Sequence, residues 1–528
     1  MAPPTRLDML PPVFAEGAWA ASVDGVWPPR LRVGRGSAGV VAGWIFHRRS
    51  PIVSLGVAVG RTVSPVTAHS MPRADVFDSL HQDGDEPSTA TYTSGFWAVV
   101  GLPGVEHDGE TACALVARTQ AGDEWRVDLP PLDRAPEPSL PGTRRDPRRV
   151  SICMATYDPD VELFERQIES IRAQSHSHWH CVITDDGSRP EVLDAMRRVI
   201  GGDPRFALHP EPRRLGPYFN FERALARASP DAGLVALADQ DDEWYPDKLT
   251  RLVAALGTGH VLAYSDQRLT TRDRRVLSET FWVDRRNQWH DLQCLLLSNT
   301  VTGAATLLRR ELLDRALPFP PRLPAMHHDH WIALVARVQG TLTYVDEPLY
   351  DYVQHAGQVV GHAAAASRPR VEPRDELHPS WERALLLRWQ RHYFEHLLPM
   401  QLMATALLER FGDETRPSDR DVLRRAAAGD GSRAGLCALA RTVPARRHGP
   451  MLGYGRDALL GALWRRVVPI RAARGDRPHV DGRHSVHMAS LAVDYGPGTP
   501  DTGTPDTGTP DTGTPVSDPA RGTAPECP

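Results

Sequence analysis

The sequence predicts a mixed α/β protein in which an open, mostly parallel sheet follows a β-sandwich and precedes a helical region. Three observations support this fold class. Residues 33–134 hold short apolar runs separated by Gly, Pro and Asp, residues 150–368 alternate between strand-like and helix-like periodicity, and helical stretches dominate beyond residue 369. A chain of 528 residues is also too long for one hydrophobic core.

We expect six segments along the chain. They are an N-terminal extension that is partly disordered (1–32), a β-sandwich accessory domain (33–134), a linker rich in Pro and Arg (135–149), the α/β domain (150–368), a helical region (369–482) and a disordered tail (483–528). The tail repeats Gly-Thr-Pro-Asp-Thr over residues 498–515 and has essentially no apolar side chains with which to form a core.

The β-sandwich is predicted from alternating runs such as residues 51–59 (PIVSLGVAV) and 111–117 (TACALVA). Tryptophans such as Trp44 and Trp97 either bind glycan on an exposed face or pack in the core, which is where a sandwich usually keeps them. The segment that follows is poor in apolar residues and rich in Pro and Arg, a composition typical of an interdomain linker.

The α/β domain begins with a predicted strand at residues 150–155, followed by a helix in which Val161, Phe164, Ile168 and Ile171 recur at helical spacing. A second strand covers residues 180–184, a helix runs through residues 192–200, and a third strand covers residues 233–238. Repeated βα units predict an open parallel sheet, and such sheets bind ligands beyond the carboxyl ends of their strands.

The helical region is predicted from stretches such as residues 381–389 (WERALLLRW) and 457–466 (DALLGALWRR). An apolar stripe, which includes Leu459, Leu463 and Trp464, lies beside Arg465 and Arg466. Such a stripe either packs inside a helical bundle, the commoner case, or makes a peripheral contact with an anionic membrane.

Charge and cysteine content exclude several classes of protein. The net charge is -5 with both signs interspersed, which argues against nucleic acid as a main partner. Lysine occurs once, at Lys248, among 61 lysines and arginines, and we attribute the imbalance to codon bias from a GC-rich genome. The six cysteines lack C-x-x-C spacing, so neither a disulfide framework nor a zinc site is indicated. The N-terminus lacks the apolar core of a signal peptide and no apolar run reaches membrane-spanning length, so we expect a cytoplasmic protein.

Polar side chains follow all three predicted strands of the α/β domain. They are Thr156 and Tyr157 after the first, residues 185–188 (DDGS) after the second and residues 239–242 (DQDD) after the third. Carboxylates at a strand end suit a hard divalent cation that bridges to phosphate oxygens, and a tyrosine suits stacking on a base. A solvated acidic loop is the alternative for any one of these motifs alone, but their coincidence favours a nucleotide-diphosphate site.

The same residues resemble the inverting family 2 glycosyltransferases of the GT-A fold, especially their rhamnosyltransferase-like branch. The resemblance spans residues 150–362 and follows the order of the family's motifs. These are residues 151–158 (SICMATYD), 167–174 (QIESIRAQ), 184–188 (TDDGS), 238–248 (ADQDDEWYPDK), 301–304 (VTGA), 309–312 (RREL), 328–331 (HDHW) and 352–355 (YVQH).

The resemblance implies a role for individual residues. Nucleoside contacts are implied for Thr156, Tyr157, Asp185 and Asp186. A site for the diphosphate and a divalent metal, Mn²⁺ or Mg²⁺, is implied for Asp239, Asp241 and His355, where the alternative for His355 is a structural histidine. His327, His328 and His330 receive no firm role.

Asp329 is the predicted catalytic base, because direct displacement needs one group to accept the proton of the acceptor hydroxyl. Its alternative role is the N-cap of the helix that follows. Thr302 and Gly303 are expected to let the main chain approach donor or acceptor, unless Gly303 marks a simple bulge. Trp244 and Trp331 either line a sugar pocket or belong to the core.

The predicted function is metal-dependent, inverting transfer of a sugar from a nucleoside diphosphate donor, dTDP-rhamnose or a UDP-sugar, to a bacterial surface or cell-wall glycan, including a lipid-linked acceptor. No Gln-x-x-Arg-Trp motif follows Asp329, which by the same resemblance favours addition of one or a few sugars. One rival is a non-catalytic glycan-binding scaffold. The other is a nucleotidyltransferase, disfavoured because residues 151–159 lack glycine and lysine. Location is expected in the cytoplasm, with the inner face of the plasma membrane as a variant.

Overall fold

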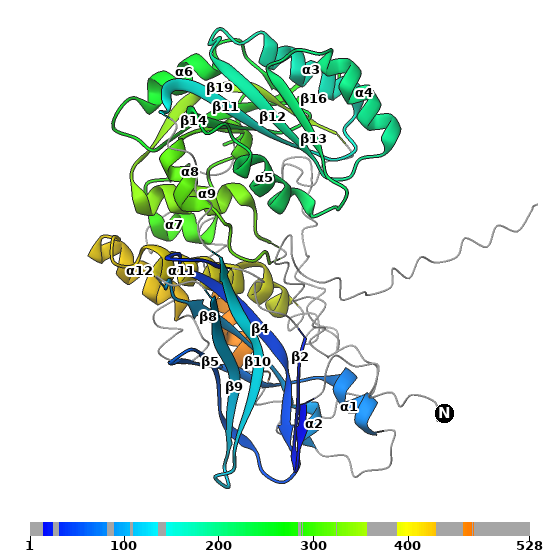
Figure 1. Ribbon diagram of the computed structural model, residues 1–528, viewed down its shortest axis with the longest axis vertical. Coiled ribbons are helices and arrows are strands. Elements are labelled where there is room, and N and C mark those ends of the chain that lie inside the picture. The colour runs from blue at the N-terminus through cyan, green and yellow to red at the C-terminus, as the bar shows by residue number, and fades with distance from the viewer. Residues whose placement is uncertain are drawn as a thin grey trace, which may run out of the picture.

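The computed structural model describes residues 14–24, 31–81, 89–105, 109–135, 144–282, 287, 289–323, 325–355, 388–428, 458–466 and 468. These residues form the expected mixed α/β protein, with a β-sandwich, a large mixed sheet covered by helices, and C-terminal helices (Figure 1). The predicted fold class is therefore confirmed. The tail at 483–528, the stretch 369–387 of the helical region and most of the predicted linker lie outside the described residues.

The β-sandwich consists of two five-stranded sheets. One sheet has the order β1 (Phe14–Glu16), β2 (Trp19–Val23), β4 (Ser37–His47), β8 (Gly95–Leu102) and β7 (Ala68–Met71); the other has the order β3 (Leu31–Arg32), β10 (Glu124–Ala135), β9 (Gly109–Thr119), β5 (Ile52–Val59) and β6 (Thr62–Pro65). Short helices α1 (Ala74–His81) and α2 (Thr89–Tyr92) lie in the connection between β7 and β8. Alternate residues such as Val57, Leu115 and Val127 face inwards and form one core.

The sandwich begins earlier in the chain than expected. Strands β1 to β3 lie within the predicted extension, residues 1–32, and pair with β4 and β10. The prediction failed here because these strands are only two to five residues long, too short for their periodicity to show in the sequence. Trp44 and Trp97 are each 1% exposed, so the core alternative holds for both and neither offers a face to glycan.

The large sheet has nine strands. Its order is β13 (Phe206–Pro210), β12 (Trp179–Asp185), β11 (Asp146–Thr156), β14 (Ala232–Ala238), β18 (Thr306–Arg309), β16 (Leu262–Thr271), β19 (Leu342–Gln354) and β15 (Glu243–Trp244), with β17 (Val276–Ser278) beside β16. Strands β13, β12, β11, β14, β16 and β19 run one way, while β18, β15 and β17 run the other. The sheet is thus mostly parallel, as predicted.

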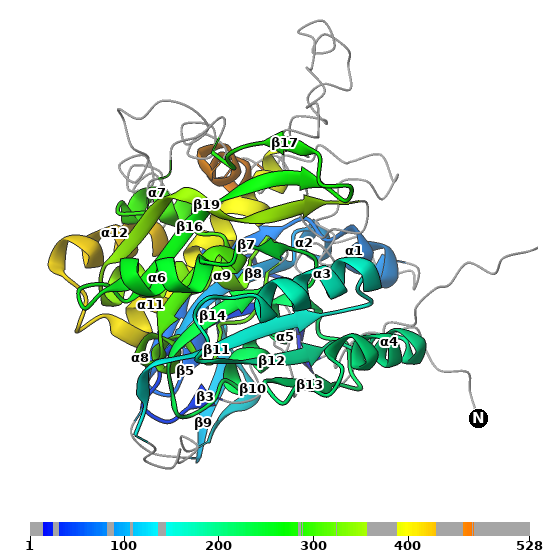
Figure 2. The same cartoon turned by 90° about the horizontal axis from the view of Figure 1, so that it is seen from above.

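Helices cover both faces of this sheet (Figures 1 and 2). The helices are α3 (Val161–Arg172), α4 (Pro190–Ile200) and α6 (Lys248–Leu256) on the face away from the sandwich, and α5 (Gly216–Ala226), α8 (Arg310–Ala316) and α9 (His328–Gln339) on the other, with α7 (Leu292–Leu297) beside α9. The predicted strand and helix positions between residues 150 and 238 are confirmed. Every residue of β14 is buried, which explains its unbroken apolar sequence.

The C-terminal helices lie between the sandwich and the α/β domain (Figure 1). They are the π-helical turn η4 (Tyr393–Leu397), α11 (Leu398–Phe411), α12 (Pro417–Ala427) and a further helical segment at 458–466. Helix α11 packs against β4 and β8 on one side and against α7 and α9 on the other. A Cβ atom at Gly36 would overlap the main-chain carbonyl of Glu409, so the sandwich and α11 meet at main-chain distance.

Aromatic packing holds the segment at 458–466 in place. Trp464 is 2% exposed and stacks on Trp97, with ring centroids 6.2 Å apart, while the indole N–H of Trp97 donates to the Tyr393 hydroxyl at 2.8 Å. The apolar stripe was expected either to pack inside the protein or to contact a membrane, and its member Trp464 packs inside the protein. Within the described residues no helix is long and apolar enough to cross a membrane.

Candidate active site

The carboxyl ends of β11, β12 and β14 meet at one edge of the large sheet. Thr156 is in register with Asp185, and Met154 with Ala238, so the polar residues that follow these strands are brought together as predicted. The side chain of Gln240 joins two of the ends: it accepts the Tyr157 N–H at 2.8 Å and donates to the Tyr157 carbonyl at 3.3 Å. Gln240 had no predicted role, because a glutamine between aspartates carries no distinguishing pattern.

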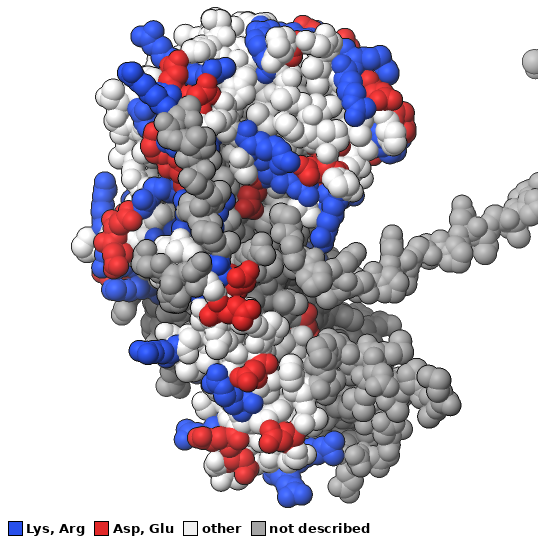
Figure 3. Space-filling view, in the orientation of Figure 1, with Lys and Arg blue, Asp and Glu red and all other residues white. Residues whose placement is uncertain are grey.

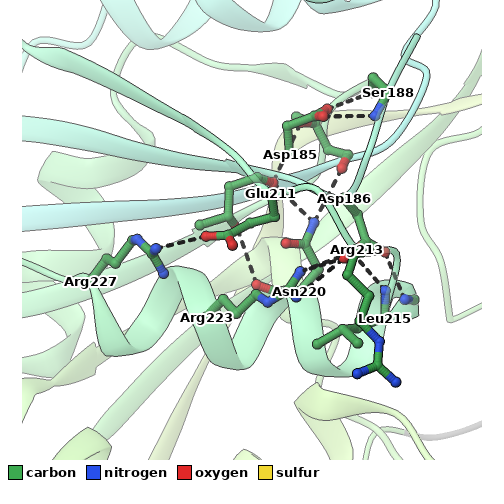
Figure 4. A network of polar contacts seen from close by, with 12 residues as sticks. Asp185, Asp186, Ser188, Glu211, Arg213, Leu215, Asn220, Arg223 and Arg227 are labelled. Atoms are coloured by element: carbon green, nitrogen blue, oxygen red, sulfur yellow. Dashed lines mark hydrogen bonds and ion pairs between the residues drawn. The ribbon is translucent and has the colours of Figure 1, made fainter. Parts of the chain in front are cut away.

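We call residues 185–188 the first acidic turn, and its carboxylates are fully engaged (Figure 4). Asp185, which is 0% exposed, accepts from the Ser188 N–H at 2.8 Å and from the Thr156 hydroxyl at 3.0 Å. Asp186 accepts from the main-chain N–H groups of Leu215 at 2.8 Å and Gly216 at 2.7 Å, and from Arg223 at 3.1 Å. Burial raises the pKa of Asp186, and these bonds and Arg223 oppose the rise.

These bonds tie the turn after β12 to the loop between β13 and α5. Asn220 adds to them by donating to the carbonyls of Thr156 at 3.2 Å and Thr184 at 3.0 Å (Figure 4). Three of the four predicted nucleoside contacts, Thr156, Asp185 and Asp186, are thus at most 2% exposed and bonded to the protein itself. Tyr157, in contrast, is 37% exposed.

Arg214 lies over the ring of Tyr157, with its guanidinium carbon 3.7 Å from the ring centroid. The arginine comes from the loop that the first acidic turn holds at the start of α5. A stacked aromatic and guanidinium pair offers two flat faces to a planar ligand and a positive charge to an anion. Arg214 was not predicted as a site residue, since one arginine is not conspicuous in an arginine-rich chain.

We call residues 239–242 the second acidic turn, and its carboxylates are much less well paired. Asp242 is 1% exposed, and neither of its carboxylate oxygens has a hydrogen-bond partner within the described structure. Burial, together with the charges of Asp241 and Asp329, raises the pKa of Asp239 to about 7, against the opposing effect of Lys248. A cluster of crowded carboxylates with unfilled acceptor capacity is suited to a cation.

Asp241 and His355 come together although 114 residues separate them, with His355 Nε2 2.7 Å from Asp241 Oδ2. Their side chains are 14% and 19% exposed, so both reach the molecular surface. The hydrogen bond to Asp241 raises the pKa of His355, with burial acting against it. The structure thus brings the Asp241 carboxylate next to the imidazole that follows β19, and the role of both as metal ligands stays a prediction.

The chemistry of these side chains fits a divalent metal. In the part of the chain that the structure describes, no group of three or more His, Cys, Asp or Glu side chains is arranged as a complete metal site. Mg²⁺ in nucleotide sites is commonly held by only one or two carboxylates, with phosphate oxygens and water completing the shell. Asp241 and His355, backed by the unpaired carboxylate of Asp242, match that kind of open site rather than a closed protein cage.

Asp329 lies across from the second acidic turn, in the first turn of α9. Its negative charge contributes to the raised pKa of Asp239, which places the two carboxylates in one electrostatic neighbourhood. Oδ2 accepts the Gly303 N–H at 3.1 Å, and Oδ1 accepts the N–H of His330 at 2.7 Å. The N-cap alternative is wrong in position, because the N-cap of α9 is His327, whose side chain makes no capping bond.

Residues 302–306 form a turn next to Asp329, the predicted catalytic base, and we call it the base-side turn. It carries the predicted pocket residues Thr302 and Gly303. Gln267 donates to the Thr302 hydroxyl at 3.1 Å, and the Thr306 hydroxyl donates to the Gly303 carbonyl at 2.7 Å. Gly303 begins a 3-10 helix, Gly303–Ala305, so it is not a bulge in a strand. A Cβ atom at Gly303 would lie 2.8 Å from His328 Nε2 and 3.3 Å from the Asp329 Cβ, so only glycine lets the turn approach Asp329 this closely.

The two predicted pocket tryptophans belong to the core. Trp331 is 0% exposed, donates its indole N–H to the Ala316 carbonyl at 2.9 Å and lies beneath the guanidinium of Arg410. Trp244 is 2% exposed and is covered by Lys248. The sugar-pocket alternative is therefore corrected for both. Both tryptophans stand next to acidic motifs in the sequence, which suggested that their side chains would be exposed. Tertiary packing buries both side chains instead.

The remaining histidines of this region have structural surroundings. His328 stacks on Phe221 with ring centroids 3.8 Å apart, and burial lowers its pKa to about 4. His330 places Nε2 2.6 Å from the Leu295 carbonyl, which fastens α9 to α7. His327 is exposed.

Comparison with known proteins gives a consistent result for the α/β domain. Residues 151–317 match the family model described as Glycosyl transferase family 2. A protein of Nostoc sp. named as an uncharacterized glycosyltransferase, alr2836, is 25% identical over 237 residues, which is 42% of this chain and 68% of that protein. The putative teichuronic acid biosynthesis glycosyltransferase TuaG of Bacillus subtilis is 26% identical over 160 residues, which is 30% of this chain and 61% of that protein.

Among solved structures, S. aureus TarS (residues 1–349), in complex with UDP-GlcNAc, aligns with 62% of this chain and 92% of its own at 16% identity and a TM-score of 0.36. The alignments to curated relatives span between 12% and 68% of those proteins' own lengths. The family match covers all three strand ends and the base-side turn. It supports a family 2 glycosyltransferase in the α/β domain and leaves the sandwich and the C-terminal helices outside the matched region.

Proposed function

We propose that this protein is a metal-dependent, inverting glycosyltransferase that moves a sugar, rhamnose or another hexose, from a nucleoside diphosphate donor to a bacterial cell-surface or cell-wall glycan. The single observation that carries the proposal is the arrangement at the sheet edge. There Asp241 pairs with His355, while Asp329 is held close enough for its charge to act on Asp239. The family match at residues 151–317 and the name of the relative TuaG support the reaction class and a cell-envelope acceptor.

Each part of the site has a function in this proposal. Tyr157 and Arg214 face the nucleoside, and the first acidic turn fixes the loop that presents Arg214. Asp241 and His355 hold a divalent metal, Mn²⁺ or Mg²⁺, which when bound neutralises the charge on the leaving diphosphate. Thr302 and Gly303 form the wall of the donor and acceptor pocket beside Asp329.

Asp329 is the group that we assign to proton transfer. In a direct displacement the acceptor hydroxyl attacks the anomeric carbon, the bond from that carbon to the diphosphate oxygen breaks, and the hydroxyl proton passes to the Asp329 carboxylate. The Gly303 N–H and the N–H of His330 orient the carboxylate without protonating it. One base and one leaving group on opposite sides of the anomeric carbon give inversion of configuration.

Product analysis tests this function. Purified protein is incubated with a panel of dTDP-, UDP- and GDP-sugars, a glycan acceptor and Mn²⁺, and released phosphate species are identified. Transfer is expected to release nucleoside diphosphate and to invert the anomeric configuration of the sugar. In a parallel incubation with nucleoside triphosphates and sugar 1-phosphates, release of pyrophosphate would assign the site to a nucleotidyltransferase instead. Binding of nucleotide with no product from any donor would favour the glycan-binding scaffold.

Asp329→Asn provides the matched control for turnover. An asparagine side chain keeps an oxygen that accepts from Gly303 but cannot take up a proton, so the rate should fall about 10²- to 10⁴-fold. Donor binding, measured by the nucleotide-dependent rise in melting temperature, should stay close to wild type. A variant that retains more than about a tenth of the wild-type rate would remove Asp329 from this role.

A further inference from the structure

Lys248, the single lysine of the chain, is fully buried at the first residue of α6. Its ammonium nitrogen lies 3.8 Å from the ring centroid of Trp244 and 4.1 Å from that of Tyr350. Nζ donates to the main-chain carbonyl of Ala304 at 2.6 Å. The lysine is thus held between two aromatic faces and points at the base-side turn.

Burial of a cation is costly, and this one is held by specific partners. Desolvation lowers the pKa of Lys248, whereas the carboxylates of Asp242 and Asp239 act to raise it. A lone ammonium in the interior is tolerated only where opposite charges and hydrogen bonds compensate for lost hydration. The second acidic turn supplies the charge, the two rings supply cation–π attraction, and Ala304 supplies the acceptor.

The chain's own composition makes the choice of lysine informative. Among the lysines and arginines of the chain, all but Lys248 are arginine. A position that required only a positive charge would therefore be expected to hold arginine too. The space between Trp244 and Tyr350 suits a compact point charge on an unbranched stem, whereas a planar guanidinium needs a wider slot and more acceptors. The site therefore selects for the shape and charge of lysine.

Lys248 is connected to the proposed base through two hydrogen bonds and one peptide unit. Nζ holds the carbonyl of Ala304, and the preceding residue, Gly303, donates its N–H to Asp329 Oδ2 at 3.1 Å. The Gln267 and Thr306 side chains hold the same turn from other sides. The Lys248 bond ties this turn to the first residue of α6, and the charge of the lysine faces the carboxylates of Asp242 and Asp239 in the second acidic turn.

We infer that Lys248 is a positioning residue that fixes the base-side turn, and through it the carboxylate of Asp329, relative to the second acidic turn. This inference rests on the proposed function for its catalytic consequence. A displacement of about 1 Å at a reacting group lowers rates by about 10²-fold, so a small relaxation of the turn is sufficient. The lysine has no exposed surface and reaches neither donor nor acceptor.

The kinetic test uses Lys248→Met, which keeps the unbranched stem and removes the charge. We expect kcat to fall about 30- to 100-fold while KM for the donor changes less than about threefold, because the turn and not the nucleotide site is loosened. Arg310→Met is the matched control: Arg310 is 4% exposed and donates to the Ala228 carbonyl at 2.9 Å, on the far side of β14 from the site. That control should lose stability and keep kcat.

Amine rescue separates positioning from general loss of structure. Lys248→Ala leaves an empty slot between two aromatic rings, and small alkylammonium ions are suited to such slots. Propylamine and butylamine should restore part of kcat in Lys248→Ala and have no effect on Arg310→Met. A structural defect alone would not respond to a free amine.

Hydrogen exchange provides a readout that does not require turnover. The Gly303 amide, which is bonded to Asp329, should exchange faster in Lys248→Met than in wild type, while amides of the first acidic turn should be unchanged. If wild type transfers no sugar but exchange at the base-side turn still depends on Lys248, the proposed function fails and the positional role stands. Unchanged exchange together with unchanged kcat in a folded Lys248→Met protein would overturn the inference, as would a change in KM alone.

Discussion

The two acidic turns follow β12 and β14, the strands on either side of β11, yet the carboxylates of the two turns are in opposite states. In the first acidic turn Asp185 and Asp186 accept bonds from main-chain N–H groups, hydroxyls and Arg223. In the second, Asp242 has two buried oxygens without a described partner, and burial together with Asp241 and Asp329 raises the pKa of Asp239 to about 7. The carboxylates of the first turn are satisfied within the protein, whereas those of the second keep unfilled acceptor capacity even though the charge of Lys248 lies near them.

This contrast separates residues that hold the site together from residues that await a ligand. Buried polar groups are normally satisfied, so a buried carboxylate without a partner requires a specific explanation. A cation bound with a nucleoside diphosphate is the explanation that the family match at residues 151–317 favours. The mixed charges on the face seen in Figure 3 show no large patch of one sign, so we assign the attraction for the donor to the local site.

The strongest test of the contrast is Asp241→Ala. We expect the variant to lose activity by at least about 100-fold and to lose the metal-dependent rise in melting temperature on addition of nucleoside diphosphate. Wild type should gain about 2.7 kcal/mol at a ligand concentration of about 100 times Kd. Without ligand, the loss of the bond to His355 and the relief of the repulsion between Asp241 and Asp239 act on stability in opposite directions, so each melting temperature with nucleotide is compared with that of the same protein without it.

Asp247→Ala is the matched control for that experiment, because it removes an exposed carboxylate six residues further along the chain. Its nucleotide response should equal that of wild type. If both variants lost the response equally, net charge rather than a metal ligand would account for the effect.

Asp186→Asn should instead act on the unliganded fold. An amide NH₂ cannot accept from both Leu215 and Gly216 as the carboxylate does, and Arg223 loses its ion pair. We expect a loss of about 2–3 kcal/mol in the free energy of unfolding, measured by denaturant titration without nucleotide. Asp194→Asn, at an exposed position on α4, should leave stability unchanged. Wild-type stability with weakened nucleotide binding would show that Asp186 belongs to the ligand site.

The sequence predicted which residues meet at the sheet edge but not the state of their side chains. Periodicity located β11, β12 and β14, and parallel strands necessarily bring their carboxyl ends together. Whether Asp186 is already bonded depends on Leu215 and Arg223, which lie 29 and 37 residues away. Such partners come from tertiary structure, as does the Arg410 guanidinium that covers Trp331.

Glu222 sharpens the comparison because it is an enclosed carboxylate outside both turns. Burial raises its pKa from 4.5 to about 7, with the Phe319 N–H and the charges of Arg32 and Arg410 opposing the rise. The folded protein therefore binds this proton more tightly than the unfolded chain, and the associated stability, complete below pH 4.5, is lost as pH rises through 7.

Glu222→Gln should remove that loss. Between about pH 5 and pH 8, the free energy of unfolding should fall by about 1–2 kcal/mol more in wild type than in the variant. This energy difference allows for partial solvent screening of Glu222. Chemical denaturation at the two pH values measures it. Glu165→Gln, on the exposed side of α3, should follow wild type. An identical pH dependence for Glu222→Gln would show that the enclosure of Glu222 does not perturb its protonation.

Arg214→Ala is expected to have the smallest effect and tests what the first acidic turn is for. If that turn serves to present Arg214 over Tyr157, removal of the guanidinium should weaken nucleotide binding about two- to fivefold, the size of an exposed cation–π contact. Arg213→Ala removes the same charge from the adjacent exposed position and keeps the main-chain carbonyl that accepts from Arg223. Isothermal titration of both variants with the preferred nucleoside diphosphate separates stacking from net charge. Equal losses would assign the effect to charge alone, and the first acidic turn would then support the fold without contributing to base recognition.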